Sequence, residues 1–508
     1  MRLIFPLVLI LSALPGAAAE LRLESVDMQG NPVWARIEVR DAQGAMFQPS
    51  FPLRDKTARN VPMGGPWYVG SFVAQGEIKL DVPPGDYRVV SERGPEYNRL
   101  DVPVTVKDGV TAFVKLENER WIDMNEMGWF SGDFHVHRPP DDLPALLQAE
   151  GLNLGVVFTM WNKRDLFEGR KIPRNSAIKT DATHIYTVNN AEDERGGGAW
   201  MLHGLREKLG LAVDGRWYPP GVDFIEKAKA QRYVPTGMPW IDVEKPFWWE
   251  APVVMALEQP DSLGLLHNHF NQYGVLANEA WGRARDEEKR PGASGFTESS
   301  LELNYRYWNL GFRVPASAGS ASGVLPNPAG YNRIYVQLNE PFGVEPFYRE
   351  LRQGKSFVTN GPMLFFEAFE EPGGSIRVLV DVRSRDPLDR VEVVANGVVI
   401  QTFGAPPGKR SFRTELSVAG GLYSWIAVRA FEQSADTVRM AHSQPYWVDA
   451  PFGVRSDAEF FIRWIDELIR QSEQDEKRFA NDREREAMLG LYRQAREVYE
   501  QKRAAVPR

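Results

Sequence analysis

Two His-x-His pairs stand out in a chain of 508 residues that contains only seven histidines. The first pair is His135 and His137, and the second pair, His267 and His269, follows the apolar run 263–266. In a strand, alternate side chains point to the same face, so each pair would direct two imidazoles into one space. Imidazole is the commonest protein ligand for zinc and similar metals. A lone histidine is more often a satisfied core residue, but two such pairs predict a metal site.

The composition limits which other groups could take part. The chain has no cysteine, so thiolates are excluded as ligands and nucleophiles, and any metal must be held by His, Asp and Glu. A formal net charge of −8, with both signs interspersed, gives no indication of nucleic-acid binding. The length exceeds what a single hydrophobic core usually supports, so we expect more than one domain.

The N-terminus has the pattern of a signal peptide. A short positive start is followed by an apolar run over 3–14 and a small-residue cleavage site at 17–19. The run is too short to span a bilayer comfortably, and no other stretch is long and apolar enough. We therefore expect residues 1–19 to be removed, leaving a periplasmic or extracellular protein without a stable membrane span.

Residue patterns divide the rest of the chain into four regions. Residues 20–118 alternate as strands do and resemble the transthyretin-like or carboxypeptidase-regulatory-like β-sandwich. Residues 119–365 combine apolar strand-like runs with helical patterns, which favours an α/β layout. Residues 366–450 predict a second β-sandwich, with an Asn-Gly hairpin signal at 396–397. Residues 451–508 predict a helical hairpin that docks on the body or on a protein partner.

Three motifs of the central region point to one family. The segment Gly-Asp-Phe-His-Val-His at 132–137 looks like the opening motif of the PHP (polymerase and histidinol phosphatase) superfamily. Segments 309–320 and 354–362 are similar to its branch that includes carbaryl hydrolase, and the resemblance covers roughly residues 120–365. It implies a distorted (β/α)7 barrel with metals at the carboxyl ends of its strands, here flanked by the two β-sandwiches and the helical hairpin.

The resemblance also implies a ligand set. The residues that match the family's ligands are His135, His137, Glu192 and one of the two histidines His267 and His269, with His203 as a further candidate. Trp161 stands where the family has a ligand histidine, and 319–323 lacks the customary Asp and His. These departures favour a single divalent metal over a cluster. Zinc suits a few His and carboxylate ligands with an open position, and manganese or iron are the alternatives.

Further side chains could act on a substrate at such a metal. A carboxylate would accept the proton of the attacking water, and Asp133 and Glu194 are the candidates, with Asp193 beside them. Three basic side chains could bind an anionic group of the substrate: Arg138, Arg195 and Arg313. Trp161 could form an aromatic wall of the substrate site. Surface or ion-paired arginines are the simpler explanation for each arginine taken alone.

Together these patterns predict an exported metal-dependent hydrolase that cleaves an ester-type bond in a small-molecule or glycan-type substrate. Phosphoesters, carboxyl esters and carbamates all remain open. The alternative is a non-catalytic glycan- or protein-binding protein on a degenerate PHP barrel, which the missing ligands and abundant tryptophans favour. The presence of both His-x-His pairs favours the enzyme.

Overall fold

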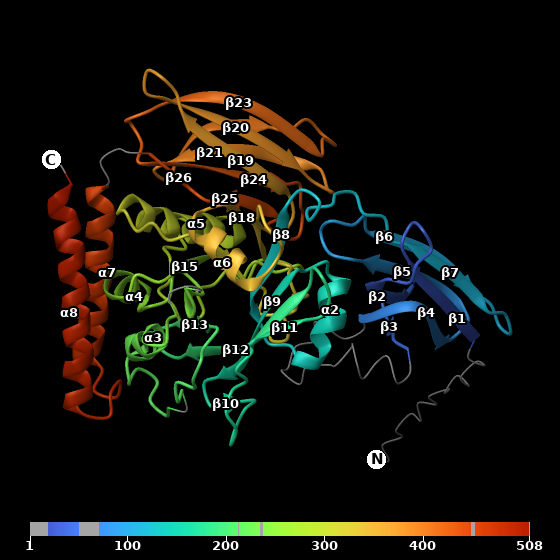
Figure 1. Cartoon of the computed structure of the whole chain (residues 1–508), viewed down its shortest axis with the longest axis horizontal. Helices are drawn as coiled ribbons and strands as arrows, with labels where there is room; N and C mark the ends of the chain where they lie inside the picture. The colour runs from blue at the N-terminus through green and yellow to red at the C-terminus, as the bar shows by residue number, and fades with distance from the viewer. Residues whose placement is uncertain (1–18, 50–70, 212, 234–236, 449–452, 507–508) are drawn as a thin grey trace, which may run out of the picture. The chain divides into compact units, whose positions relative to one another are not determined.

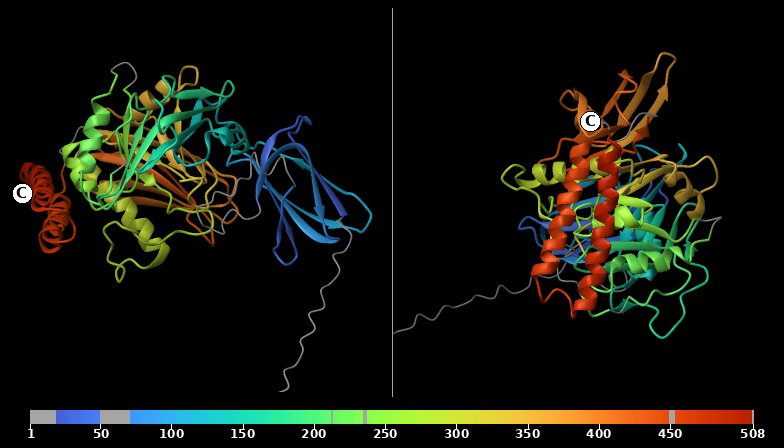
Figure 2. Two further views of the ribbon diagram at one scale, coloured as in Figure 1. Left: turned by 90° about the horizontal axis from the view of Figure 1, so that it is seen from below. Right: turned by 90° about the vertical axis from the view of Figure 1, so that its left-hand side faces the viewer.

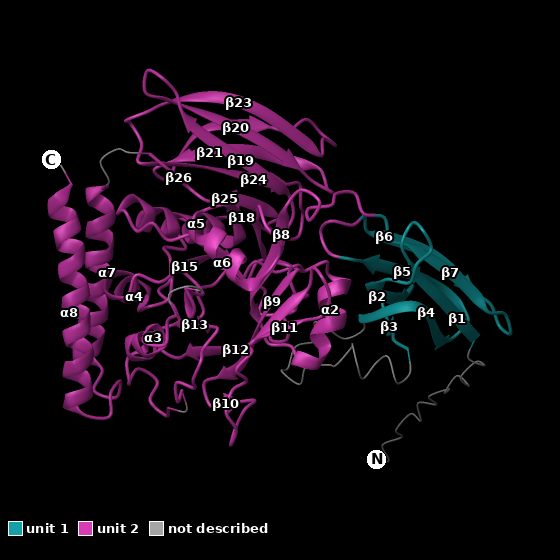
Figure 3. Ribbon diagram, viewed as in Figure 1, with its two compact units in different colours: residues 1–60, 68–93, 98–119 teal, residues 61–67, 94–97, 120–508 magenta. Residues whose placement is uncertain are grey.

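The computed structural model describes residues 19–49, 71–211, 213–233, 237–448 and 453–506 (Figure 1). The protein is a strand-rich α/β structure, and the chain divides into two compact units, residues 1–60, 68–93 and 98–119, and residues 61–67, 94–97 and 120–508 (Figure 3). The predicted signal peptide lies outside the described residues except for Ala19. In the part of the chain that is described, no helix is long and apolar enough to cross a bilayer.

The first unit is built from one sheet around its own core. Its strands are β1 (Ala19–Val26), β2 (Trp34–Asp41), β3 (Met46–Phe47), β4 (Phe72–Val82), β5 (Gly85–Glu92), β6 (Leu100–Val106) and β7 (Ala112–Glu117). Their order is β6-β5-β2-β4-β1-β7, with β3 paired to β2, and the end strands β6 and β7 lie near each other. Alternate side chains, as in β4, are buried and exposed, which is the pattern that the sequence indicates. The result is a nearly closed, barrel-like sheet.

The second unit contains a run of strands that share one direction. They are β8 (Trp129–Val136), β9 (Leu154–Trp161), β12 (Ile185–Glu194), β14 (Trp240–Val243), β15 (Ser262–Leu266) and β16 (Ala316–Ala318), with the antiparallel β13 (Ala199–His203) between β12 and β14. Helices α2 (Leu143–Ala149), α3 (Gly221–Lys229), α4 (Ala251–Leu257) and α5 (Gly292–Asn309) lie in the connections, together with η2 (Pro140–Asp142), β10 (Arg164–Asp165) and β11 (Ala177–Lys179). A parallel bridge between Val136 and Ser322 brings the chain after β16 back to β8. The carboxyl ends of these strands therefore meet at one edge, where α/β proteins place their sites.

The same sheet continues from β8 into an all-β region. It runs through β17 (Arg333–Gln337), β18 (Ser356–Thr359), β25 (Met440–Ser443), β24 (Trp425–Glu432), β21 (Leu388–Ala395) and β22 (Val398–Gly404), with β26 (Tyr446–Trp447) beside β24 and α6 (Val344–Arg352) between β17 and β18. A second sheet, β19 (Met363–Glu370), β20 (Ser375–Arg383) and β23 (Ser411–Ala419), shares its hydrophobic core. The predicted hairpin joins β21 and β22, and Asn396 and Gly397 both have positive φ, as a tight hairpin turn needs.

Two long helices, α7 (Arg455–Gln474) and α8 (Asp482–Ala505), end the described chain and run side by side (Figure 2, right). Their aromatic faces are buried in the core that also contains α3 and α4. Trp464 Nε1 donates to the Trp249 carbonyl at 3.1 Å, and Tyr492 OH donates to Glu250 Oε1 at 2.6 Å. The helical hairpin predicted from the sequence thus packs on the body of its own unit.

Candidate metal centre

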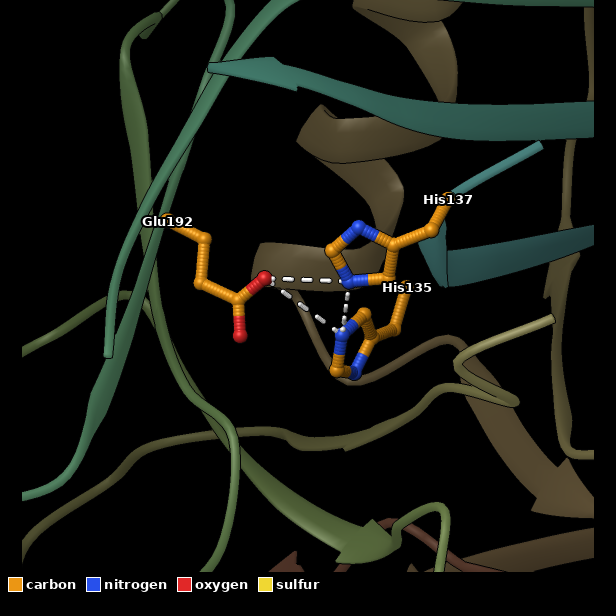
Figure 4. A group of neighbouring side chains, drawn as sticks. All are labelled: His135, His137 and Glu192. Carbon is orange, nitrogen blue, oxygen red and sulfur yellow. Dashed lines mark hydrogen bonds and ion pairs between the residues drawn. The ribbon is translucent and has the colours of Figure 1, made fainter. Parts of the chain in front are cut away.

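Three predicted ligands converge at the carboxyl ends of two of the parallel strands. His135 lies in β8, His137 follows β8 directly, and Glu192 lies near the end of β12. Their side chains point toward one another (Figure 4): the two Nε2 atoms are 2.9 Å apart, and Glu192 Oε2 lies 3.0 Å from His137 Nε2 and 3.7 Å from His135 Nε2. All three ligand atoms lie within 4.8 Å of one another, and among the described residues this is the group that could hold a metal ion.

A loop that returns from β16 holds the first pair in place. A Cβ atom on Gly319 would lie 2.5 Å from His135 Cβ, and one on Gly323, where φ is +103°, would lie 2.9 Å from the His137 carbonyl carbon. His137 N also donates to Ser322 O at 2.8 Å. Both positions require glycine because a Cβ atom there would displace the His135 side chain or the His137 backbone. Segment 319–323 therefore packs directly against His135 and His137.

Asp133 anchors this loop. Its carboxylate accepts hydrogen bonds from Ser320 Oγ at 2.6 Å, from Ser320 N at 3.0 Å and from Gly330 N at 2.7 Å. It also accepts one from His135 N at 3.0 Å. A carboxylate with its oxygens engaged by four donors has little capacity left for a proton from water. The geometry favours an anchoring role for Asp133 over the predicted catalytic one.

The charges of the centre follow from burial and close carboxylates. Burial alone would lower the pKa of His135, but the carboxylates of Glu192 and Glu244 outweigh it and raise this pKa to about 10. Burial would raise the pKa of Glu192, yet the two imidazoles lower it to about 2. Burial lowers the pKa of His137. The carboxylates around these imidazoles thus favour a positive charge at this place.

The surroundings of the Glu192 carboxylate support the fit to a cation. Glu192 Oε2 is buried, and its close polar contacts among the described residues are the two imidazole nitrogens at 3.0 and 3.7 Å, with no well-formed hydrogen bond to either. Buried polar atoms are normally satisfied, and exceptions call for an explanation. Two imidazoles and a carboxylate are a donor set that zinc accepts, with room for a further ligand. The residues present therefore fit a divalent metal.

The second histidine pair lies outside this group. His267 Nε2 lies 3.0 Å from Ser300 Oγ, and His269 Nδ1 lies 2.9 Å from the Asn278 carbonyl oxygen. Phe247 and Phe296 pack around both rings. Burial lowers the pKa of His269 to about 3 and that of His267 well below its usual value. The expected fourth ligand from this pair is therefore not part of the group that the structure brings together.

His203 is likewise placed elsewhere. Its Nδ1 lies 3.0 Å from Tyr348 OH, and its ring packs edge-on against Phe134 and Phe158. Burial lowers its pKa to about 3. These contacts are typical of a core histidine, and His203 does not belong to the ligand group.

Glu194 and Trp161 lie beside the ligand group. Trp161 Nε1 donates to Glu194 Oε2 at 3.1 Å, and the Trp161 ring centroid lies 4.5 Å from that of His137. Burial and the negative charge of Glu192 raise the pKa of Glu194 to about 7. A carboxyl group that titrates near neutrality beside candidate ligands is a suitable proton acceptor.

The three predicted arginines are spread over different places. Arg195 forms an ion pair with Asp193, with Nε 2.5 Å from Oδ1, so Asp193 is engaged as well. Arg138 is buried next to the first pair, and its Nε donates to Ser322 Oγ at 3.2 Å. Arg313 stacks over the Trp447 ring, whose centroid is 5.5 Å away. Of the three, Arg195 lines the hollow described next.

A hollow of about 590 Å³ opens beside the centre. Its lining includes the predicted residues Trp161, Glu194 and Arg195. It also includes Trp281, which is 53% exposed, and the exposed side chains of Lys163, Arg164 and Arg216. Sequence reasoning missed the three basic residues, although Lys163 and Arg164 closely follow Trp161 in the sequence. Aromatic and basic side chains, with Asp214 paired to Lys163, thus line a hollow next to the ligand group.

Glu244 and Lys245 were also missed. They follow β14 directly, and both are buried. Glu244 Oε1 lies 3.4 Å from His135 Nδ1, and Glu244 Oε2 lies 2.6 Å from Lys245 Nζ. The signal available in the sequence was their position: two charged residues at the end of an apolar strand, where sites form in this type of fold.

No protein-family model matches this chain, and neither a curated protein nor a solved structure matches it. The resemblance to the PHP superfamily remains a prediction from the motifs.

Proposed function

We propose that this protein is an exported metal-dependent hydrolase of the PHP type that cleaves an ester-type bond. The observation that carries the proposal is the convergence of His135, His137 and Glu192 in one buried group at strand ends. The parallel strands of the second unit, joined by helices, are compatible with a distorted (β/α)7 barrel in which β13 runs in the opposite direction. The two imidazoles and the carboxylate would hold one divalent metal, zinc in the first place.

The residues around the ligands supply the rest of the chemistry. A bound divalent metal makes water a nucleophile near neutral pH and polarises the attacked oxygen. Glu194 would be the acceptor for the proton of such a water, and Trp161 holds its carboxylate through Nε1. His135 and His137 would hold the metal as neutral imidazoles, so metal binding would release a proton.

The neighbouring hollow is the proposed substrate cleft. Trp161 and Trp281 would face a ring or another flat apolar group, and Arg195 and Arg216 at the rim would attract an anionic one. Phosphoesters, carboxyl esters and carbamates all have an oxygen that a metal can polarise, and each can carry a ring or another flat apolar group. The cleft therefore suits a small ester with an aryl or sugar portion.

A second candidate function uses the same cleft without chemistry. The half-exposed Trp281 lines the same hollow as Trp161, and two such rings suit a sugar; glycan binding on an inactive barrel would need no metal. The pKa of Glu194 near neutrality favours the enzyme, because glycan binding gives no reason to place a partly buried carboxyl group beside Glu192.

The test is hydrolysis by the reconstituted full chain. The protein, loaded in turn with zinc, manganese or iron, is assayed with aryl phosphate mono- and diesters, aryl acetates and an aryl N-methylcarbamate. We expect turnover of one class, lost in the variant with His135→Ala and His137→Ala. Metal binding without turnover of any class, together with glycan binding, would support the second candidate.

A further inference from the structure

A chain of three buried charged or ionisable groups runs behind the ligand group, on the side away from Glu192. Lys245 Nζ lies 2.6 Å from Glu244 Oε2, and Glu244 Oε1 lies 3.4 Å from His135 Nδ1. His135 Nδ1 and Glu244 Oε1 have no other hydrogen-bonding partner among the described residues. The opposite nitrogen of the same ring, Nε2, faces His137 and Glu192.

We propose that Glu244 is a positioning residue that holds His135 with Nε2 directed at the metal. A neutral imidazole that ligates through one nitrogen carries its proton on the other, and the partner of that second nitrogen fixes the ring. Glu244 is the acceptor placed to receive the Nδ1 proton. The inference rests on the proposed metal-dependent function and goes beyond it by assigning a residue outside the ligand group.

Lys245 and Trp248 fix the other end of the carboxylate. Lys245 Nζ is its ion-pair partner and lies 4.5 Å from the Trp248 ring centroid, and Trp248 Nε1 donates to Glu244 Oε2 at 3.3 Å. A buried carboxylate that keeps a cation and a donor on one oxygen retains the other as a pure acceptor. The pair therefore leaves Oε1 available for His135.

The backbone also places Glu244 closely. Glu244 N donates to the Ala199 carbonyl at 3.3 Å, which attaches the end of β14 to β13. A Cβ on Gly264 of β15 would lie 1.9 Å from the Glu244 carbonyl oxygen, so the neighbouring strand can approach only because residue 264 is glycine. Contacts with β13 and β15 thus fix the backbone position of Glu244, from which its side chain reaches His135.

The geometry distinguishes this role from direct ligation. Glu244 faces Nδ1 of His135, whereas the ligand atoms of the group are the Nε2 atoms and a Glu192 oxygen. A carboxylate on the far nitrogen cannot share a metal with Nε2 of the same ring. Its removal should therefore weaken metal binding without removing a ligand.

The test is zinc affinity of the full chain, measured by competition with a chromophoric chelator. In Glu244→Ala we expect binding to weaken by about 10–100-fold, the usual effect of losing the carboxylate partner of a ligand histidine. Glu244→Gln should restore part of the loss because its carbonyl oxygen can still accept from Nδ1. The matched control is Glu250→Gln, a buried carboxyl group of the same segment that contacts Tyr492 and should leave zinc affinity unchanged.

A second readout separates positioning from general damage. The absorption spectrum of the cobalt-loaded protein should change in both Glu244 variants, while near-ultraviolet circular dichroism of the metal-free forms stays that of the wild type. If Glu244→Ala does not fold, Glu244→Gln alone should still bind zinc more weakly than Glu250→Gln. Wild-type zinc affinity and an unchanged cobalt spectrum in the Glu244 variants would overturn this inference alone. A wild type that binds no zinc would overturn the proposed function, and this inference with it.

Discussion

The two His-x-His pairs have the same spacing and similar burial, yet their surroundings are opposite. His135 and His137 face the carboxylate of Glu192, and His135 also faces Glu244. His267 and His269 face a hydroxyl group, backbone carbonyls and phenylalanine rings. As a result the pKa of His135 is raised to about 10, because two carboxylates outweigh its burial, whereas burial lowers that of His269 to about 3. Spacing brings two imidazoles together, but the neighbouring strands decide whether they form a cation site.

Strand order explains the difference. β12 pairs with β9, which pairs with β8, so Glu192 at the end of β12 reaches the first pair across a short distance. The second pair follows β15, and α5 supplies Ser300 and Phe296 against it. The side chains of α5 that contact the pair are thus a hydroxyl group and an aromatic ring. The four predictions that follow test this contrast, beginning with the largest effect.

Replacing the proton acceptor beside the first pair should have the largest effect. In Glu194→Gln we expect kcat/KM to fall by about 10²–10⁴-fold, the usual contribution of a general base, while zinc content stays that of the wild type. The measurement is steady-state kinetics with the best ester substrate, with Glu250→Gln as control. If Glu194→Gln turns over the substrate nearly as fast as the wild type, a group other than Glu194 accepts the proton of the attacking water.

Zinc affinity should rise with pH. Because Glu192 and Glu244 overcome burial and raise the pKa of His135 to about 10, this imidazole holds a proton below that pH, and zinc must displace it. Affinity should therefore increase by about tenfold per pH unit for each proton displaced, between pH 6 and 9. His269, with its pKa at about 3, adds no such proton. Chelator competition across this range measures the slope, and a flat profile would contradict the charge state assigned to His135.

The second pair should matter for stability. In His267→Ala the Ser300 hydroxyl loses its buried partner, so we expect the free energy of unfolding to fall by about 1–3 kcal/mol. Zinc stoichiometry should not change. Urea denaturation of the metal-free protein measures the first effect and elemental analysis the second. Loss of zinc in this variant would return His267 to the ligand set.

The smallest effect should come from the aromatic wall beside the first pair. Trp161→Phe keeps a ring next to His137 but loses the N–H donated to Glu194, whereas Trp161→Ala loses both. An aromatic contact is worth about 0.5–1.5 kcal/mol, so we expect KM for an aryl ester to rise by about 2–10-fold in Trp161→Ala. The KM of Trp161→Phe should stay near that of the wild type, with kcat reduced. Equal KM values in all three proteins would remove Trp161 from the substrate cleft.

Local patterns predicted much of this molecule. The alternation in the first unit, the Asn396-Gly397 hairpin and the apolar stripes of the last two helices each depend on near neighbours in the sequence, and each is present in the structure. The placement of His135 and His137 on one side of a strand end follows from the same periodicity.

Contacts between distant segments could not be predicted in this way. Asp133 is engaged by Ser320 and Gly330 because the chain after β16 returns to β8, and no spacing in the sequence shows that return. Glu244 reaches His135 because β14 ends near β8 in space. A polar residue directly after a strand can be predicted to lie near the site. Which side chain it contacts there depends on the order of the strands in the sheet.

The most direct test of the account is the metal content of the full chain purified without chelator, measured by elemental mass spectrometry. Two double variants are measured beside it, one with His135→Ala and His137→Ala and the other with His267→Ala and His269→Ala. We predict about one zinc, manganese or iron per wild-type chain, none in the first variant and an unchanged amount in the second. No metal in the wild type after reconstitution, or equal loss in both variants, would contradict the assignment of the site to the first pair.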